Sequence, residues 1–213
     1  MTHRVRDGVL QVTTRIHNLS TEPMPVSIGF HPYFTLTDSR RDEWTVAVGA
    51  RTQWLLAPNK IPTGETEPIE RLFADPTAIA LKDHDLDHVF SDLIRDSDGR
   101  AVMTVKGKTQ QIDVLVGPRY RAVVIYAPRP APTPASTPTS TPASAPPPGG
   151  AGQPASPSQP DRNFICFEPM AGITDAMNLS HKGRYQELQS IPPGEVWEES
   201  FWVRPKGFAG AGR

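Results

Sequence analysis

The chain has 213 residues, and its 22 lysines and arginines nearly balance 23 aspartates and glutamates, for a formal net charge of −1. This balance argues against nucleic acid as a partner, because polyanions are held mainly by a surplus of positive charge. A single cysteine excludes an internal disulfide and a zinc cage built from cysteines. No apolar run is long enough to span a membrane and no apolar signal segment follows Met1, so we expect a cytoplasmic protein with no membrane partner.

Apolar and polar residues alternate along much of the chain, which is the period of a strand with one buried face. In the first such segment Leu10, Val12 and Ile16 are separated by polar residues. A turn signal follows at residues 18–23, and residues 26–30 are expected to return as a strand beside the first. Strands are predicted, in chain order, at residues 10–16, 26–30, 44–48, 53–56, 101–105, 112–116, 121–126, 164–168 and 199–203.

Helical periodicity is nearly absent, and one turn at residues 175–179 is the clearest segment that fits it. Many short strands separated by Gly, Pro, Asn and Asp are typical of sandwiches and barrels. The sequence therefore predicts an all-β fold.

A proline-rich tract interrupts this pattern at residues 128–160. Its 33 residues hold 12 of the 24 prolines, 9 serines and threonines, 6 alanines, 3 glycines and a single charged residue. Such a composition has almost nothing to bury and predicts an extended, disordered coil. The roughly fifty residues after the tract are too few to form a core alone without a disulfide or a metal. We therefore interpret the tract as an insertion into a single domain that spans residues 1–213.

His31 lies in the segment GFHPYF at residues 29–34, between aromatic residues and directly before Pro32. A proline disfavours helical backbone in the residue before it, so the imidazole is expected on an extended segment. Aromatic rings suit the apolar face of a sugar and a polar tip suits its hydroxyls, which makes Tyr33 and Phe34 candidate substrate contacts. A histidine packed in the core is the alternative interpretation.

Glu168 is the second candidate, in the segment FICFEP at residues 164–169. Strand alternation places Phe164, Cys166 and Glu168 on one face. A carboxylate at the end of an apolar strand is costly to bury unless it is paired or functional, and Pro169 is expected to end the strand and leave Glu168 at the rim of a sheet. Cys166 is better explained as a small buried residue than as a nucleophile.

The histidines and acids at residues 83–90 could suggest a metal site. Neighbouring side chains on a strand point to opposite faces, however, and no second cluster with ligand spacing accompanies them. We therefore expect no metal here, and Asp87, at the entrance of a strand, is the stronger candidate for contact with a ligand.

Five motifs occur in the order typical of aldose 1-epimerases, and outside the tract they extend over nearly the whole chain. They are GFHPYF at residues 29–34, IPTGE at 61–65, DHVF at 87–90, FEP at 167–169 and IPPGE at 191–195. On these motifs the chain resembles galactose mutarotase-type proteins. The resemblance implies an antiparallel β-supersandwich with an open sugar cleft, and a reaction that interconverts the α and β anomers of an aldose.

Carried over by motif, the resemblance implies that His31 is the general acid that protonates the ring oxygen of the sugar. Glu168 corresponds to the general base that takes the proton from the C1 hydroxyl, and Asp87 to the acid that holds sugar hydroxyls. The expected partner is an aldohexose, and this chemistry needs no metal, nucleotide or redox cofactor.

Compared with this family, the motif at residues 29–34 comes early in the chain. We expect the chain to lack the N-terminal third of the family's domain, which supplies strands, an arginine and a histidine to the cleft. Two alternatives stay open: a sugar-binding β-sandwich without turnover, and a glycoside hydrolase that uses Asp87 and Glu168 as a carboxylate pair. The basic pair Arg40-Arg41 is interpreted as part of a solvated loop rather than as a rim for a sugar phosphate.

Deleting residues 133–158 should leave the fold nearly unchanged, because the closure entropy of a loop depends only weakly on its length. The melting temperature of the shortened chain, measured beside that of the full chain, should differ by no more than a few degrees. A larger loss would mean that the tract packs on the rest of the molecule.

Overall fold

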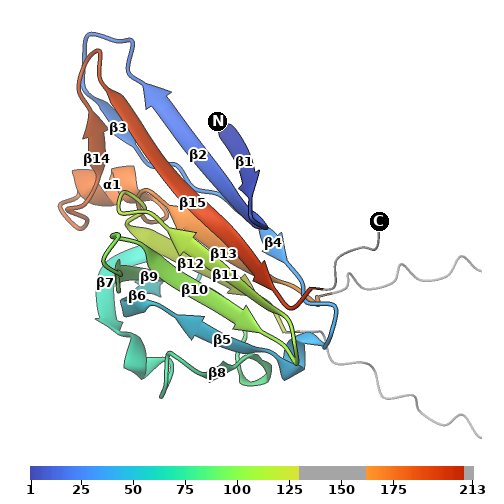
Figure 1. The fold of residues 1–213 in the computed structure, drawn as a ribbon. Helices are drawn as coiled ribbons and strands as arrows, with labels where there is room; N and C mark the ends of the chain where they lie inside the picture. The colour runs from blue at the N-terminus through green and yellow to red at the C-terminus, as the bar shows by residue number, and fades with distance from the viewer. Residues whose placement is uncertain (130–161, 209–213) are drawn as a thin grey trace, which may run out of the picture.

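The computed structural model describes residues 1–129 and 162–208. These residues form a seven-stranded sheet, a six-stranded sheet and a two-stranded sheet, and every strand pair is antiparallel (Figure 1). The described part of the chain contains one short α-helix, α1 (Ala176–His181). The prediction of an all-β fold is therefore confirmed. No helix in the described ranges is long and apolar enough to cross a membrane.

The seven-stranded sheet has the order β1-β2-β15-β11-β10-β5-β8. Its strands are β1 (Thr2–Arg6), β2 (Val9–His17), β15 (Val196–Lys206), β11 (Gln111–Val116), β10 (Ala101–Lys106), β5 (Thr45–Val48) and β8 (Ile79–Ala80).

The six-stranded sheet has the order β4-β13-β12-β9-β6-β7. Its strands are β4 (Tyr33–Phe34), β13 (Ile165–Met170), β12 (Ala122–Ala127), β9 (Leu86–Leu93), β6 (Ala50–Leu56) and β7 (Pro62–Pro68). The two-stranded sheet pairs β14 (Gln189–Ile191) with β3 (Met24–Val26), and three 3₁₀ turns are η1 (Arg41–Glu43), η2 (Ile69–Arg71) and η3 (Leu81–Asp83).

The expected pairing of residues 10–16 with residues 26–30 is wrong. β2 pairs with β1 on one side and with the eleven-residue β15 on the other, from Val196↔His17 to Val203↔Leu10. The returning segment is the three-residue β3, which pairs with β14 instead. The chain does turn at residues 18–23, as the turn signal predicts. A local signal, however, cannot show which distant strand will pair with the edge of β2.

The main hydrophobic core lies between the two large sheets. Strand alternation turns one face of each sheet inward, and these faces meet as fully buried aliphatic and aromatic side chains. The seven-stranded sheet contributes, among others, Val46, Met103, Val105, Val114 and Val116, and the six-stranded sheet contributes Phe90, Val123, Ile125, Ile165 and Phe167.

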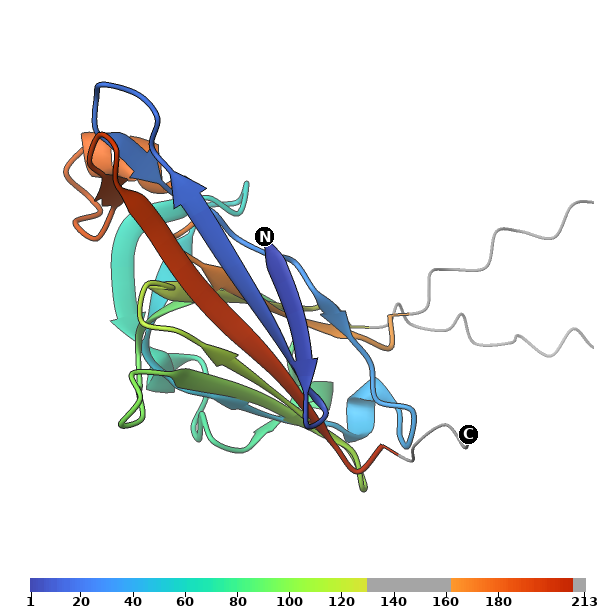
Figure 2. The same cartoon turned by 45° about the horizontal axis from the view of Figure 1, so that its top comes forward.

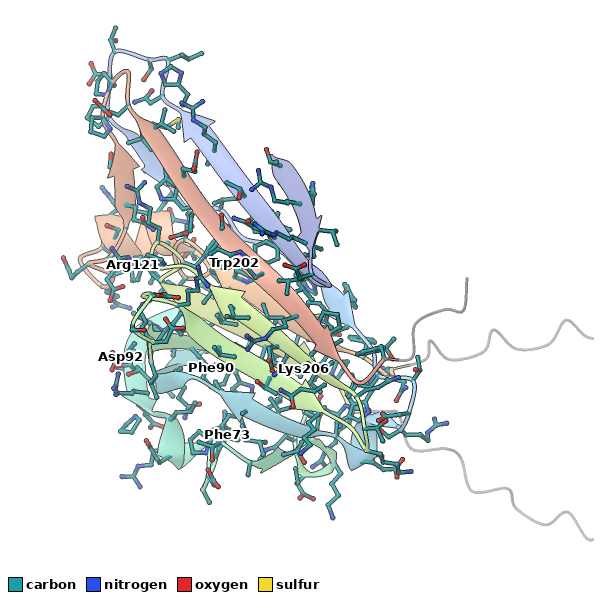
Figure 3. The ribbon with its side chains drawn as sticks, in the orientation of Figure 1. Phe73, Phe90, Asp92, Arg121, Trp202 and Lys206 are labelled. Atoms are coloured by element: carbon teal, nitrogen blue, oxygen red, sulfur yellow. The ribbon has the colours of Figure 1, made fainter. Side chains whose placement is uncertain are left out.

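The outer face of the seven-stranded sheet is polar. Trp202 and Lys206 of β15 lie on this side of the molecule (Figure 3). The Asp113 carboxylate of β11 accepts from Arg204 Nη2 and from Lys206 Nζ, each at 2.9 Å, and the guanidinium of Arg100 lies 4.3 Å from the centre of the Trp202 ring. These cross-strand contacts stabilise a solvated surface rather than a binding cavity.

The second face of the six-stranded sheet is covered only in part. A smaller apolar cluster packs α1 and the segment after it onto this face, through Val89 and Val124 from the sheet and Ala176, Leu179 and Tyr185 from the cover. Figure 2 shows α1 at the same end of the molecule as β14 and β3. The remainder of this face, toward β4, is left for the candidate site.

The strands on the two sides of the proline-rich tract pair with each other. β12 lies beside β13 in one sheet, from Ala122↔Met170 to Tyr126↔Cys166. The tract was placed at residues 128–160, and its residues 130–160 lie outside the described ranges. We keep the single domain with an inserted tract as a proposal, supported by this pairing.

Arg41 is not part of a solvated loop. Its side chain is 1% exposed, and the guanidinium donates to three backbone carbonyls: Leu81 at 2.8 Å, His84 at 2.7 Å and Ala127 at 2.5 Å. Burial lowers the pKa of this guanidinium. The planar guanidinium carries several N–H donors and can satisfy several carbonyls at once, so Arg41 connects the turn η1 to η3 and to the end of β12 by hydrogen bonds.

Replacing Arg41 with Met should lower the free energy of unfolding by about 3 kcal/mol, because three buried carbonyls lose their donor. Urea denaturation measures the loss. Arg40→Met is the matched control, since the neighbouring Arg40 is exposed and its loss should change stability by less than about 0.5 kcal/mol. Equal effects of the two substitutions would contradict this account of Arg41.

Candidate functional site

The strand β13 positions two of the candidate side chains. Glu168 and Cys166 are two residues apart on it and therefore point to the same face, away from the main core. Pro169 does not end the strand, contrary to expectation: it pairs with Val123, and its carbonyl accepts from Phe30 N at 3.1 Å. Because the N and O of one residue point to the same side of a strand, the missing N–H faces Phe30 and costs no bond to β12.

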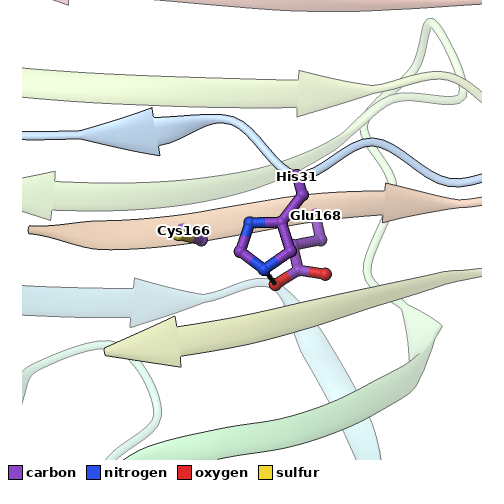
Figure 4. A group of neighbouring side chains, drawn as sticks. All are labelled: His31, Cys166 and Glu168. Carbon is purple, nitrogen blue, oxygen red and sulfur yellow. Dashed lines mark ion pairs between the residues drawn. The ribbon is translucent and has the colours of Figure 1, made fainter. Parts of the chain in front are cut away.

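His31 is held over Glu168 by the segment that precedes β4. Gly29 forms a bridge with Met170, and a Cβ at Gly29 would overlap Met170 Sδ, so a side chain there would require the Met170 side chain to move. The next residues bring the imidazole back over the sheet, and His31 Nε2 lies 3.1 Å from Glu168 Oε1 (Figure 4). The chain thus brings its two proposed catalytic groups into direct contact.

Aromatic rings surround the imidazole. The Tyr33 ring stacks on it, with centroids 4.9 Å apart and planes at 21°, and the Tyr126 ring of β12 meets it at 6.0 Å and 69°. Phe164 packs against both tyrosines, at 4.9 Å and 5.8 Å. These rings limit the orientations of His31, whose side chain remains 48% exposed.

Phe34 does not join this group. Its ring lies 6.2 Å from that of Phe167 and packs against the main core. Successive residues of a strand point to opposite faces, so β4 turns Tyr33 toward His31 and Phe34 away from it. Phe34, predicted as a substrate contact, is therefore partly buried on the face that packs against the main core, opposite to the face that carries Tyr33.

The surroundings of Glu168 disfavour the charged form of its carboxyl group. Its side chain is 11% exposed, and burial, followed by repulsion from the Asp87 carboxylate, raises its pKa to about 7. Both causes disfavour the charged form. A carboxyl group with a pKa near neutrality can accept and return a proton with little driving force in either direction, which is the property of an acid–base catalyst.

Asp87 lies across β12 from Cys166. The register Cys166↔Tyr126↔Asp87 puts the three side chains in one row on the same face of the sheet. Asp87 Oδ2 is 3.6 Å from Lys60 Nζ, which comes from the loop between β6 and β7. Both residues line a hollow of about 380 Å³, together with Trp54 and His88.

The volume of this hollow falls in the range of small-molecule pockets. Three larger hollows, of about 600, 640 and 460 Å³, lie beside β7, beside β14, and beside β5 and β10. None of the three is lined by His31, Glu168 or Asp87, whereas the hollow of 380 Å³ is lined by Asp87, although not by His31 or Glu168, so we place the candidate site beside it.

Cys166 lies beneath the His31–Glu168 pair. It is fully buried, and burial, followed by the nearby Glu168 carboxylate, raises the pKa of its thiol to about 12, which is unsuited to a nucleophile. Single ligand-type atoms of His31, Cys166 and Glu168 all lie within 4.8 Å of one another, and among the described residues this is the group of three that could hold a metal ion. Residues 83–90 supply no such group there.

Two residues at the site were missed in the sequence analysis: Tyr126 and Lys60. Residues 121–126 were expected to form a strand, but alternation could not show that Tyr126 would lie between Cys166 and Asp87. Lys60 lies in a turn segment, APNK at residues 57–60, and the sequence alone predicts that its charge is solvated. The pairing of β6 with β9 brings it close to Asp87. Both depend on strand order rather than on local pattern.

The raised pKa of Glu168 predicts a stability change with pH. Its pKa is about 7 in the folded chain and near 4.5 when unfolded, so the native state binds more protons between these values and stability falls as pH rises through this window. Glu168→Gln should remove that loss, gaining on the order of 2 kcal/mol over the wild type between pH 5 and pH 8. Chemical denaturation at both pH values tests this, with the exposed Glu65→Gln as control. An equal gain at the two pH values would contradict it.

Comparison with known proteins gives a family and a fold. The family model for aldose 1-epimerase matches residues 1–204. A galactose mutarotase-like protein from Clostridium acetobutylicum superposes with a TM-score of 0.70 at 19% identity, covering 97% of this chain and 55% of its own. The GalM/aldose epimerase homologue from C. elegans gives 0.67 at 14% identity, over 97% and 59% of the two chains.

Galactose 1-epimerase from Lactobacillus acidophilus gives a TM-score of 0.53 at 13% identity, over 97% of this chain and 66% of its own. No curated protein matches the sequence. This chain therefore spans just over half the length of the first of these solved relatives. The structures share its antiparallel β-sandwich, and the match over residues 1–204 shows that the chain belongs to the aldose 1-epimerase family.

Proposed function

We propose that this chain interconverts the α and β anomers of an aldohexose, with His31 and Glu168 as the catalytic pair. The observation that carries the proposal is the contact of 3.1 Å between His31 Nε2 and Glu168 Oε1, inside a chain of the aldose 1-epimerase family. A histidine and a carboxylate that meet on an accessible face can move two protons on one small substrate.

The reaction needs one proton delivered and one removed. Protonated His31 gives its proton to the ring oxygen while ionised Glu168 takes the proton of the C1 hydroxyl, so that the C1–O5 bond breaks and an aldehyde forms. Rotation about the C1–C2 bond presents the other face of the carbonyl. Ring closure then returns both protons, with His31 now the base and Glu168 the acid, and the chain ends in its starting state.

The remaining residues are assigned to binding. Asp87, half-exposed beside the hollow, accepts hydrogen bonds from sugar hydroxyls, and Lys60 forms an ion pair with that carboxylate at 3.6 Å. Tyr33 and Tyr126 present ring surface next to His31 and can pack against the apolar face of the sugar. Phe34 has no part in this assignment.

Glu168→Gln should lower kcat by about 10²–10⁴-fold with little change in KM, because the amide keeps the shape but cannot take a proton. His31→Asn should lower kcat to a similar extent and also raise KM, since the imidazole contacts the ring oxygen. Asp87→Asn should act mainly on KM. Polarimetry of freshly dissolved α-D-glucose and α-D-galactose measures these rates.

The same assay tests the pH dependence of the wild type. Its kcat/KM should fall on the acid side with a midpoint near pH 7, where Glu168 protonates.

Asp92→Asn is the matched control for Asp87→Asn. Asp92 lies on the same strand, β9, but is exposed and pairs with Arg51 outside the hollow, so its replacement should leave both constants unchanged. Mutarotation that survived Glu168→Gln and His31→Asn would overturn the assignment. A wild-type chain that binds sugar without speeding mutarotation would be a sugar-binding module, and cleavage of a glycoside would favour the two-carboxylate hydrolase.

A further inference from the structure

The catalytic pair shares its place with a third group that the anomerisation chemistry does not use. Cys166 and Glu168 project from one face of β13, and His31 reaches over them from the segment before β4. One ligand-type atom from each of the three lies within 4.8 Å of the other two. Bonds of about 2.0–2.3 Å in a tetrahedral zinc site place ligand atoms about 3.3–3.8 Å apart, so side-chain movements near 1 Å would bring the three groups to this spacing.

The donor set is selective by its chemistry. One sulfur, one imidazole nitrogen and one carboxylate oxygen match Zn²⁺ and similar thiophilic cations, whereas Mg²⁺ and Ca²⁺ prefer sites made of oxygen alone. The aromatic rings of Tyr33 and Tyr126 contact His31, and Phe164 packs against both of them. Three protein ligands would leave the fourth tetrahedral position for water.

We propose that His31, Cys166 and Glu168 form a binding site for a thiophilic divalent cation such as Zn²⁺, and that this cation competes with the sugar. The competition rests on the proposed function, because the cation would occupy the two groups assigned to proton transfer. Binding is a substitution without any change of oxidation state: the Cys166 S–H bond breaks, an S–metal bond forms, and the thiol proton goes to the solvent.

Burial of Cys166 explains why the cation would matter. The thiol is fully buried and carries no role in the proposed mechanism, so a small apolar residue would serve the fold equally well. Because the sulfur lies next to His31 and Glu168, however, it adds a third metal ligand to the two groups of the proposed acid–base site. The site would then be sensitive to zinc while its anomerisation chemistry stays independent of any metal.

A titration with Co²⁺ tests the binding independently of activity. The chain has a single cysteine, so charge-transfer absorption from a thiolate to Co²⁺ can come only from Cys166. We expect this absorption to saturate at one Co²⁺ per chain and to disappear when Zn²⁺ displaces the cobalt. Absence of the thiolate absorption would overturn the metal site and would leave the proposed function untouched.

Cys166→Ser and Cys166→Ala test the consequence. Loss of a direct ligand should weaken Zn²⁺ binding, measured by calorimetry, by more than the 10–100-fold that loss of an outer-shell partner costs. In polarimetry Zn²⁺ should raise the KM of the wild type without changing kcat, while both variants keep the basal rate and lose this inhibition. The exposed His3→Gln on β1 is the control and should bind Zn²⁺ like the wild type.

Two outcomes would contradict the proposal: equal Zn²⁺ affinity in the wild type and the Cys166 variants, or inhibition that persists in those variants. If Cys166→Ser does not fold, Cys166→Ala and His31→Asn still decide the metal site through the calorimetric titration. A wild type that binds Co²⁺ through Cys166 but never speeds mutarotation would reject the proposed function alone.

Discussion

The position of β13 between β12 and β4 is the constraint on which the candidate site depends. This strand carries Cys166 and Glu168 on its open face and Phe167 in the core, while its two neighbours bring Tyr126 on one side and the His31 segment on the other. The antiparallel register then fixes which side chains of neighbouring strands lie opposite one another. A slip of one residue would turn Glu168 into the core and Phe167 out to solvent, so the hydrophobic packing that holds β13 in register also aims the carboxyl group.

The site is built at a cost in stability. Holding Glu168 at 11% exposure near a second carboxylate disfavours the charge that the proposed chemistry requires, and the fold must offset this with its packed core. The same two causes bring the pKa of Glu168 to about 7, where proton transfer in both directions is easy. Stability lost at this residue and its suitability as a base thus have a single physical origin.

Polar groups at the edges of the sandwich have the opposite role. Arg41, buried with three carbonyls as acceptors, joins the turn η1 to η3 and to the last residue of β12, Ala127. That end of β12 adjoins the point at which the proline-rich tract begins. A rigid connection there keeps β12 in place beside β13 however long the following segment is, which is consistent with the weak dependence of loop closure on length.

Pattern and motifs in the sequence were enough to predict the fold class and to single out the candidate site residues. Period-two alternation predicts antiparallel strands because a sheet buries alternate side chains, and the motifs around His31, Asp87 and Glu168 are local enough to be recognised without a structure. The folded chain was needed to learn which strands pair, and with them that Phe34 faces the core, that Arg41 is buried, and that Cys166 lies next to the proposed catalytic pair.

These facts share one cause: each depends on contacts between segments that are distant in the chain. His31 and Glu168 meet because hydrophobic faces select a register among many possible strand pairings, and Tyr126 and Lys60 join them for the same reason. A local pattern can say that a residue alternates. It cannot say which residue will lie opposite, because that is settled by the free energy of packing the whole sandwich.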